Sequence, residues 1–149
     1  MVFDRTAEDV QNAQKIVSEK VKSFLTLTEE DKEALERGLF TINTANRIEE
    51  AVEELRDIVI GMGYSLTGGI SVKKWTNNDV FLGEDLIRSQ KNATILANSF
   101  VGAVNPPKEI ASYHYDVLNE LESALHELQE ATKSVKGNYK ITGIARCGN

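Results

Sequence analysis

Histidine and cysteine are the residues best suited to metal binding or nucleophilic chemistry, and this sequence contains His114, His126 and Cys147. Two histidines that bind a metal from one helical face lie four positions apart, whereas these two lie twelve apart. Cys147 lies beside Gly148, where burial and a positioned base are difficult to arrange. We therefore predict one loop histidine, one solvent-facing histidine on the last helix and an incidental thiol.

Carboxylates are abundant but do not form an acid–base pair in the sequence pattern. The run Glu49-Glu50 and Glu53-Glu54 is predicted to lie opposite an apolar helical seam, which places it in water. Gly68-Gly69 is not followed by the Gly-Lys-Ser/Thr of a phosphate-binding loop. The sequence therefore predicts no catalytic, metal-binding or cofactor-binding residue, no cofactor, and a protein that is not an enzyme.

Two ten-residue segments, residues 46–55 and 119–128, are similar in sequence. Asn, Glu, Ala, Glu and Leu recur in register at an offset of 119 − 46 = 73 residues, and an aromatic residue, Phe40 or Tyr113, lies six positions before each Asn. Such repetition indicates one supersecondary unit built twice, at about residues 40–60 and 113–133, within a single domain of residues 1–149.

The polar residues of this repeat have two possible roles. Asn46 and Asn119 can hydrogen-bond free backbone groups near a helix start, and Arg47 can pair with nearby acids. Alternatively, Asn46, Arg47 and Glu49 form a docking surface for another copy or another protein. Trp75, the single tryptophan, is more often a packing anchor than an exposed binding residue. The candidate interaction residues are Asn46, Arg47, Glu49, Trp75, Asn119 and Glu122.

Apolar periodicity predicts most of the chain to be helical. The clearest seam is Ile48, Val52, Leu55 and Val59, which step by four, three and four residues. The predicted long helices cover residues 6–24, 44–60, 84–100 and 116–136. Thr44 is the predicted cap of the second, and Arg88, Gln90 and Asn92 are predicted to point outward from the third. A short helix is predicted to begin with a capping box of Thr28 and Asp31 and to stop at Gly38.

Two short segments alternate apolar and polar residues in the manner of strands. They are residues 70–75, within a glycine-rich excursion over 64–82, and residues 139–146, after a stop at Gly137-Asn138. The second segment is predicted to pair with the first or with a neighbouring subunit. The fold class is therefore predicted to be mainly α: an antiparallel bundle of three to four long helices with a small two-stranded β element.

The composition is that of a soluble globular protein. The chain has 149 residues, a formal net charge of −6 and 41% hydrophobic residues. Its acidic balance argues against a nucleic-acid partner, which requires clustered Lys and Arg. We also find no secretory signal at the N-terminus and no apolar run long enough to span a membrane, so no membrane partner is predicted.

A series of short motifs runs through the chain in this order: Thr28-Glu29-Glu30, Gly38-Leu39, residues 42–49, Gly63-Tyr64, Trp75 with Asp79, Arg88 with Asn92, Pro106-Pro107, Asn119 with Glu122, and Gly143 with Cys147-Gly148. This series resembles a small domain of structural, tail-associated and fibre-associated proteins of phages and prophages of Gram-positive bacteria. The chain departs from the pattern at Asn119-Glu120-Leu121-Glu122, where an Ile and a preceding acid are more usual.

This resemblance implies a non-enzymatic virion component at the tail, baseplate, neck or fibre. Its predicted partners are other virion structural proteins and further copies of itself, since identical subunits commonly close into symmetric rings or trimers. The implied localisation is the virion, after synthesis in the bacterial host cytoplasm. The alternative is a soluble acidic adaptor or inhibitor that binds a basic partner, although its acids are interleaved with Lys and Arg.

Overall fold

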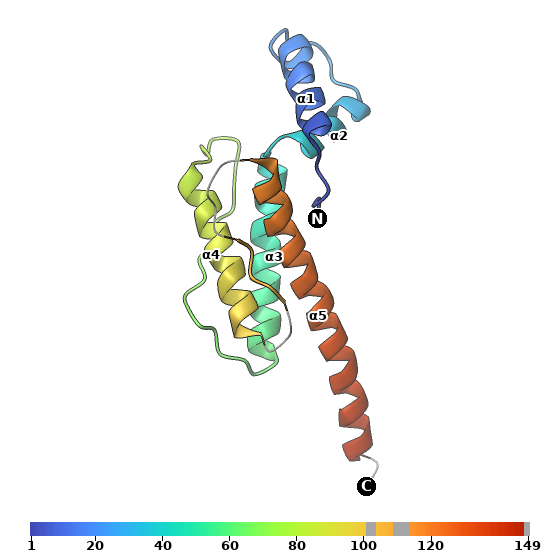
Figure 1. Ribbon diagram of the computed structural model, residues 1–149, viewed down its shortest axis with the longest axis vertical. Coiled ribbons are helices and arrows are strands. Elements are labelled where there is room, and N and C mark those ends of the chain that lie inside the picture. The colour runs from blue at the N-terminus through green and yellow to red at the C-terminus, as the bar shows by residue number, and fades with distance from the viewer. Residues whose placement is uncertain (101–103, 109–113, 148–149) are drawn as a thin grey trace.

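The computed structural model describes residues 1–100, 104–108 and 114–147, with side chains as far as residue 135. This part of the chain is mainly helical, as predicted, and contains no strand. Its elements are α1 (Ala7–Ile16), the π-helix η1 (Val17–Val21), α2 (Glu29–Gly38), α3 (Ile42–Gly61), α4 (Gly83–Ser99) and α5 (Tyr115–Cys147). Helices α3, α4 and α5 form a bundle, and the α1–α2 hairpin stands above one end of it (Figure 1).

The three bundle helices run in the same direction, away from the hairpin (Figure 1). Their N-terminal halves meet, because Arg47 of α3 bonds Glu122 of α5 and Arg88 of α4 bonds Glu49 of α3. The predicted antiparallel order is therefore wrong. Residues 62–82 can reach roughly 65 Å when extended, about twice the roughly 30 Å length of a 20-residue helix. The chain can thus return to the top of the bundle before α4 begins.

The predicted apolar seams form the core of the bundle. Ile48, Val52, Leu55 and Val59 of α3 are buried, as expected from their spacing. They pack in one cluster with Leu86, Ala93, Leu96, Ala97, Phe100, Leu118, Leu121, Leu125 and Leu128. Asn92 was predicted to point outward, but it is only 3% exposed, because its amide bonds the backbone of the returning segment at Ser71.

The predicted capping box of Thr28 with Asp31 opens α2, and a capping box that was not predicted, Thr6 with Asp9, opens α1. The predicted cap of the third helix, Thr44, is wrong, because the hydroxyl of Thr41 accepts from the Thr44 amide at 3.1 Å and α3 begins at Ile42. Phe40, two residues before α3, packs on Phe81, two residues before α4, with ring centroids 4.1 Å apart.

The predicted two-stranded element is absent from the part of the chain that the structure describes. Residues 70–75 have no regular secondary structure, and side chains of helices α3 and α4 bond their backbone in place of a partner strand. Helix α5 continues through Gly137-Asn138 to Cys147, so neither the predicted stop nor the strand at 139–146 is observed. Ile141 and Ile144 lie three residues apart, a spacing that a helix accommodates as readily as a strand does.

Close packing at one glycine holds the α1–α2 hairpin together. Gly38, the last residue of α2, was predicted as a helix stop and does end the helix. It also faces α1, where an added Cβ would lie against the carbonyl oxygen of Asp9 and 2.5 Å from the Cβ of buried Ala13. The absence of a side chain at position 38 therefore permits the two helices to meet.

We predict that Gly38→Ala destabilises the protein by about 1–3 kcal/mol, because the new methyl group overpacks this contact. Gly61→Ala is the matched control, since Gly61 also ends a helix but an added Cβ there meets nothing within 4 Å. Urea unfolding followed by circular dichroism measures both free energies of unfolding. Equal values for the two variants would contradict the proposed close approach.

Candidate functional site

The first polar cluster joins α3 to the returning segment. The side-chain amide of Asn46 donates to the Trp75 carbonyl at 3.1 Å and accepts from the Trp75 amide at 2.8 Å. One turn further along α3, Glu49 accepts from the Trp75 indole at 3.3 Å and from the guanidinium of Arg88, 3.1 Å from Oε2. We call this arrangement the α3 clamp: an asparagine holds both backbone groups of one extended residue, and the glutamate three positions later holds a cation.

The second cluster repeats this arrangement on α5. The amide of Asn119 donates to the Arg5 carbonyl at 3.0 Å and accepts from the Arg5 amide at 3.2 Å. Glu122, three positions later, has a fully buried side chain; its Oε2 lies 2.5 Å from Nη1 of Arg5 without being aligned for a hydrogen bond. Its Oε1 accepts from the Val2 amide at 3.3 Å. This α5 clamp therefore holds the N-terminal segment as the α3 clamp holds residue 75.

Arg47 connects the two clamps. Its Nε and Nη2 donate to Oε1 of Glu122 at 3.0 and 2.8 Å, so the α3 repeat supplies a cation to the glutamate of the α5 repeat. A further asparagine, Asn92 on α4, binds Ser71 in the same way. Its side-chain amide donates to the Ser71 carbonyl at 2.7 Å and accepts from the Ser71 amide at 3.4 Å. Three asparagines on three helices thus each bind the amide and the carbonyl of one non-helical residue.

All six candidate interaction residues lie in the two clamps. Asn46 and Arg47 are half-buried and bonded within the chain, whereas Glu49 and Trp75 are each only 4% exposed. The predicted solvated position of Glu49 is therefore wrong, while Glu50, Glu53 and Glu54 are exposed as predicted. Glu49 can be buried because the Arg88 guanidinium neutralises its charge and the Trp75 indole donates a hydrogen bond to it.

The sequence interpretation missed two of the cations. Arg88 was predicted to point outward and also belonged to a motif, and Arg5 was not singled out at all. Arg88 and Asn92 lie four residues apart and therefore on one helix face. This spacing could have indicated that both side chains bind the same neighbouring segment. No local pattern marks Arg5, because its partners lie more than one hundred residues away in the chain.

The candidate reactive residues lie apart from one another. His114 is exposed and pairs with Asp116 at 2.8 Å, and half-buried His126 stacks on Phe3 with ring centroids 5.1 Å apart. Cys147 ends α5, outside the described side chains. Within the described ranges, no three His, Cys, Asp or Glu side chains lie close enough to hold a metal ion, and no helix is both long and apolar enough to cross a bilayer.

A charged turn supports the α3 clamp from the solvent side. Asp79 accepts from the Thr76 hydroxyl at 2.7 Å and the Thr76 amide at 2.8 Å, and it pairs with Lys73 at 3.0 Å. The Thr76 hydroxyl contact and the Lys73 ammonium lower the pKa of Asp79 from 3.8 to about 2. The same lysine lies 3.8 Å above the Trp75 ring centroid. Hydrogen bonding to Glu49 likewise raises the pKa of Arg88 above its ordinary value.

Comparison with family models, curated proteins and solved structures finds no match to this chain. The likeness to phage structural domains therefore remains a prediction from the motifs. What the geometry itself provides is a set of polar side chains committed to positioning backbone.

We predict that Glu122→Gln lowers the free energy of unfolding by about 3–5 kcal/mol, because two guanidinium groups lose the buried charge that they share. Glu127→Gln, at an exposed position one helical turn and a half away, is the matched control and should change it by less than about 0.5 kcal/mol. Urea midpoints measured at neutral pH give both values. A loss below 1 kcal/mol in Glu122→Gln would mean that this buried charge is not a main source of stability.

The lowered pKa of Asp79 predicts an acid-sensitive α3 clamp. Because the carboxyl pKa falls from 3.8 to about 2 on folding, its stabilisation is fully present above pH 3.8 and disappears as the pH falls to about 2. The difference in urea midpoint between wild type and Asp79→Asn, followed by Trp75 fluorescence, should therefore shrink across this interval. Glu84→Gln, at another exposed acid, is the control; a pH-independent Asp79→Asn difference would contradict the mechanism.

Proposed function

We propose that the protein is a non-enzymatic structural component of a phage or phage-like particle, associated with its tail, baseplate, neck or fibre, and that it acts through subunit contacts. The motif resemblance supports this class of protein. The clamps support a scaffold role, since Asn46, Asn119 and the buried glutamates position backbone and leave few of these groups for a substrate. A rigid polar interior is suited to holding contact surfaces at fixed positions.

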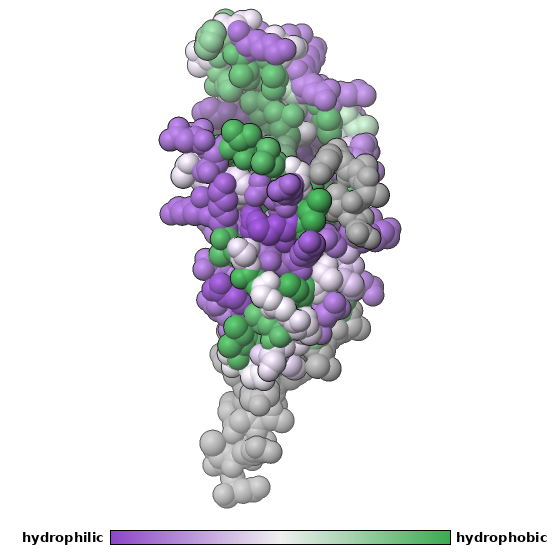
Figure 2. Space-filling model, turned by 90° about the vertical axis from the view of Figure 1, so that its left-hand side faces the viewer, coloured by the Kyte–Doolittle hydropathy of each residue, from purple (hydrophilic) through white to green (hydrophobic). Residues whose placement is uncertain are grey.

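The observation that carries the proposal is an apolar tip on the α1–α2 hairpin, formed by Val21, Phe24 and Leu25. Phe24 is 96% exposed, and Leu25 is 57% exposed. Figure 2 shows hydrophobic side chains gathered over the hairpin at the upper end of the molecule. Exposed aromatic and aliphatic groups that lie together commonly mark a protein contact. We assign this tip to contact with a further copy of the chain.

The tip is held by a strained but ordered turn. Phe24 has a φ of 54°, where a glycine is usual, and the Leu25 and Phe24 amides donate to the carbonyls of Lys20 at 2.9 Å and Val21 at 3.1 Å. These two bonds form the helix-ending motif that normally contains glycine at this position. A phenylalanine there costs about 1–2 kcal/mol of backbone strain and gains no burial in the isolated chain. A contact that covers the ring would offset that cost.

We predict opposite effects of Phe24→Gly on folding and on association. The variant should raise the free energy of unfolding by about 1 kcal/mol, because it relieves the left-handed strain. It should also weaken self-association measured by sedimentation velocity. Phe24→Leu retains both the apolar surface and the strain, so it serves as the matched control with neither change. Unaltered association in Phe24→Gly would remove the tip from the assembly.

Mass spectrometry of purified particles from the source strain tests the function itself. A copy number that is a small, fixed multiple of the tail symmetry, measured against a tail-tube or capsid protein, is the expected result. Absence from particles despite abundance in the lysate would contradict the structural role. That result would favour the adaptor or inhibitor, whose supporting observation is the exposed acidic row Glu50, Glu53, Glu54 and Asp57 on α3. Salt-sensitive binding to a basic protein would then be expected.

A further inference from the structure

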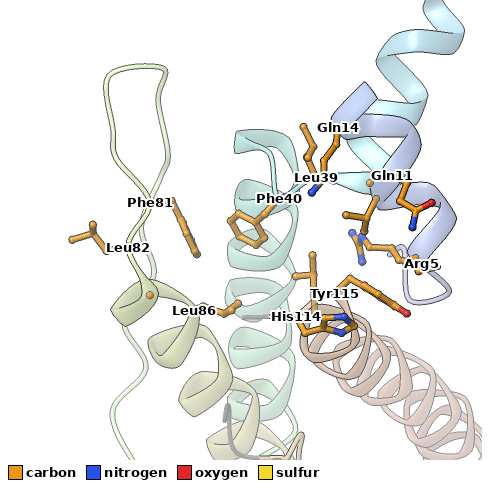
Figure 3. A pocket seen from close by; sticks show the side chains of 15 residues that line it. Arg5, Gln11, Gln14, Leu39, Phe40, Phe81, Leu82, Leu86, His114 and Tyr115 are labelled. Atoms are coloured by element: carbon orange, nitrogen blue, oxygen red, sulfur yellow. The ribbon is translucent and has the colours of Figure 1, made fainter. Parts of the chain in front are cut away.

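A cavity of about 690 Å³ lies where the hairpin meets the bundle. Side chains from α1, from the segments before α3 and α4, and from the first turns of α4 and α5 surround it (Figure 3). Its walls are largely apolar: Val10, Leu39, Phe40, Phe81, Leu86 and Leu118. Cavities of roughly 300–1,000 Å³ with apolar walls and a few polar groups are typical of small-molecule sites.

Arg5 supplies the charged group of this cavity. Its side chain is 1% exposed, and Nη1 contacts the Val2 carbonyl, Asn119 at 3.4 Å and Glu122 at 2.5 Å. Among the described residues, the other two nitrogens, Nε and Nη2, have no hydrogen-bond partner; both are closed off from solvent, so an occupant reaches them only when a neighbouring side chain turns aside. These two N–H groups form the edge of the guanidinium that binds a carboxylate with two parallel hydrogen bonds. Arg47 uses the same edge on Glu122. A buried donor pair left without an acceptor is costly, so this edge favours an anionic occupant.

The charges around the cavity favour the same occupant. No Asp or Glu is among the described residues that line it, although the protein carries a formal net charge of −6. Two guanidinium groups, Arg5 and Arg47, share the single carboxylate of Glu122. Outside the lining, Arg37 pairs with Asp4 and Asp9 at the α1 side, and His114 pairs with Asp116 at the α5 side. A cavity whose described walls are apolar around the Arg5 guanidinium is complementary to an apolar anion.

We propose that this cavity binds an amphiphilic small molecule with one carboxylate, of the class of a medium-chain fatty acid. The carboxylate accepts from Nε and Nη2 of Arg5, and the hydrocarbon chain lies along Phe40, Phe81 and Leu118. Binding at this place does not depend on the assembly role proposed above. Trp75 reports on it, because its ring packs on Phe81 with centroids 5.1 Å apart.

Isothermal titration of the full chain with decanoate tests the site, with methyl decanoate as the uncharged probe and Trp75 emission as a second readout. Saturable decanoate binding is expected, and the ester should bind at least about tenfold more weakly, since charged hydrogen bonds contribute roughly 1.5–3 kcal/mol. Arg5→Lys keeps the charge but loses the two-pronged edge, so it should weaken decanoate binding by a similar factor. Equal affinity for acid and ester, or no saturable binding, would overturn the proposal.

A second pair of variants keeps the test decisive if Arg5→Lys does not fold. Gln14 is exposed and lines the cavity, whereas Asn12 is exposed on the same helix and does not line it. Gln14→Phe should fill the cavity and abolish decanoate binding, while Asn12→Phe should leave the affinity unchanged. Equal binding by the two variants would place decanoate outside the cavity and would also overturn the proposal.

Discussion

The structure depends on the burial of two carboxylates, Glu49 and Glu122, in the N-terminal halves of parallel helices. A carboxylate removed from water requires a cation and hydrogen-bond donors, or it destabilises the fold by several kcal/mol. Neither glutamate is neutralised by its own helix: Arg88 of α4 serves Glu49, and Arg47 of α3 and Arg5 of the N-terminal segment serve Glu122. Each pair therefore fixes which helix ends meet, and together they specify a parallel arrangement that apolar seams alone would not distinguish from an antiparallel one.

Parallel helices in sequence require long returning connections, and those connections expose backbone groups that need partners. In this protein the partners are asparagine amides, each of which offers one donor and one acceptor to the backbone of a single residue. Asn46 and Asn92 hold two points of residues 62–82, and Asn119 holds the N-terminal segment. This bonding explains how backbone groups within residues 70–75 find partners without a sheet. The strand predicted from the alternating pattern is wrong, because side chains of two helices take the place of a partner strand.

The helices could be predicted from sequence because their information is local: apolar spacing defines the seam around Ile48, and Thr28 with Asp31 defines a cap. The repeat also drew attention to Asn46, Glu49, Asn119 and Glu122 through their types and spacing. Their burial could not be predicted, because periodicity classifies a carboxylate by its helical angle and contains no information about a distant arginine. The relative direction of α3 and α4 could not be predicted either, since a connection as long as residues 62–82 permits a parallel or an antiparallel arrangement. The predicted first helix, residues 6–24, reached Phe24, whereas the helical turns end at Val21 and the Phe24 ring is exposed.

The hairpin is the part of the molecule whose position depends most on a few contacts. Its two helices pack on each other at Gly38, and its junction with the bundle includes the α5 clamp on Arg5, the cavity beside it and the bonds of Glu36 in α2 to Thr41 and Asn43 at the start of α3. An occupant of that cavity would contact the hairpin and the bundle together, and would therefore restrict the angle between them. The apolar tip lies at the far end of the same hairpin, so a small change at the junction produces a larger displacement there. If both proposals hold, binding at Arg5 and association through Phe24 are coupled, because each favours one orientation of the α1–α2 hairpin.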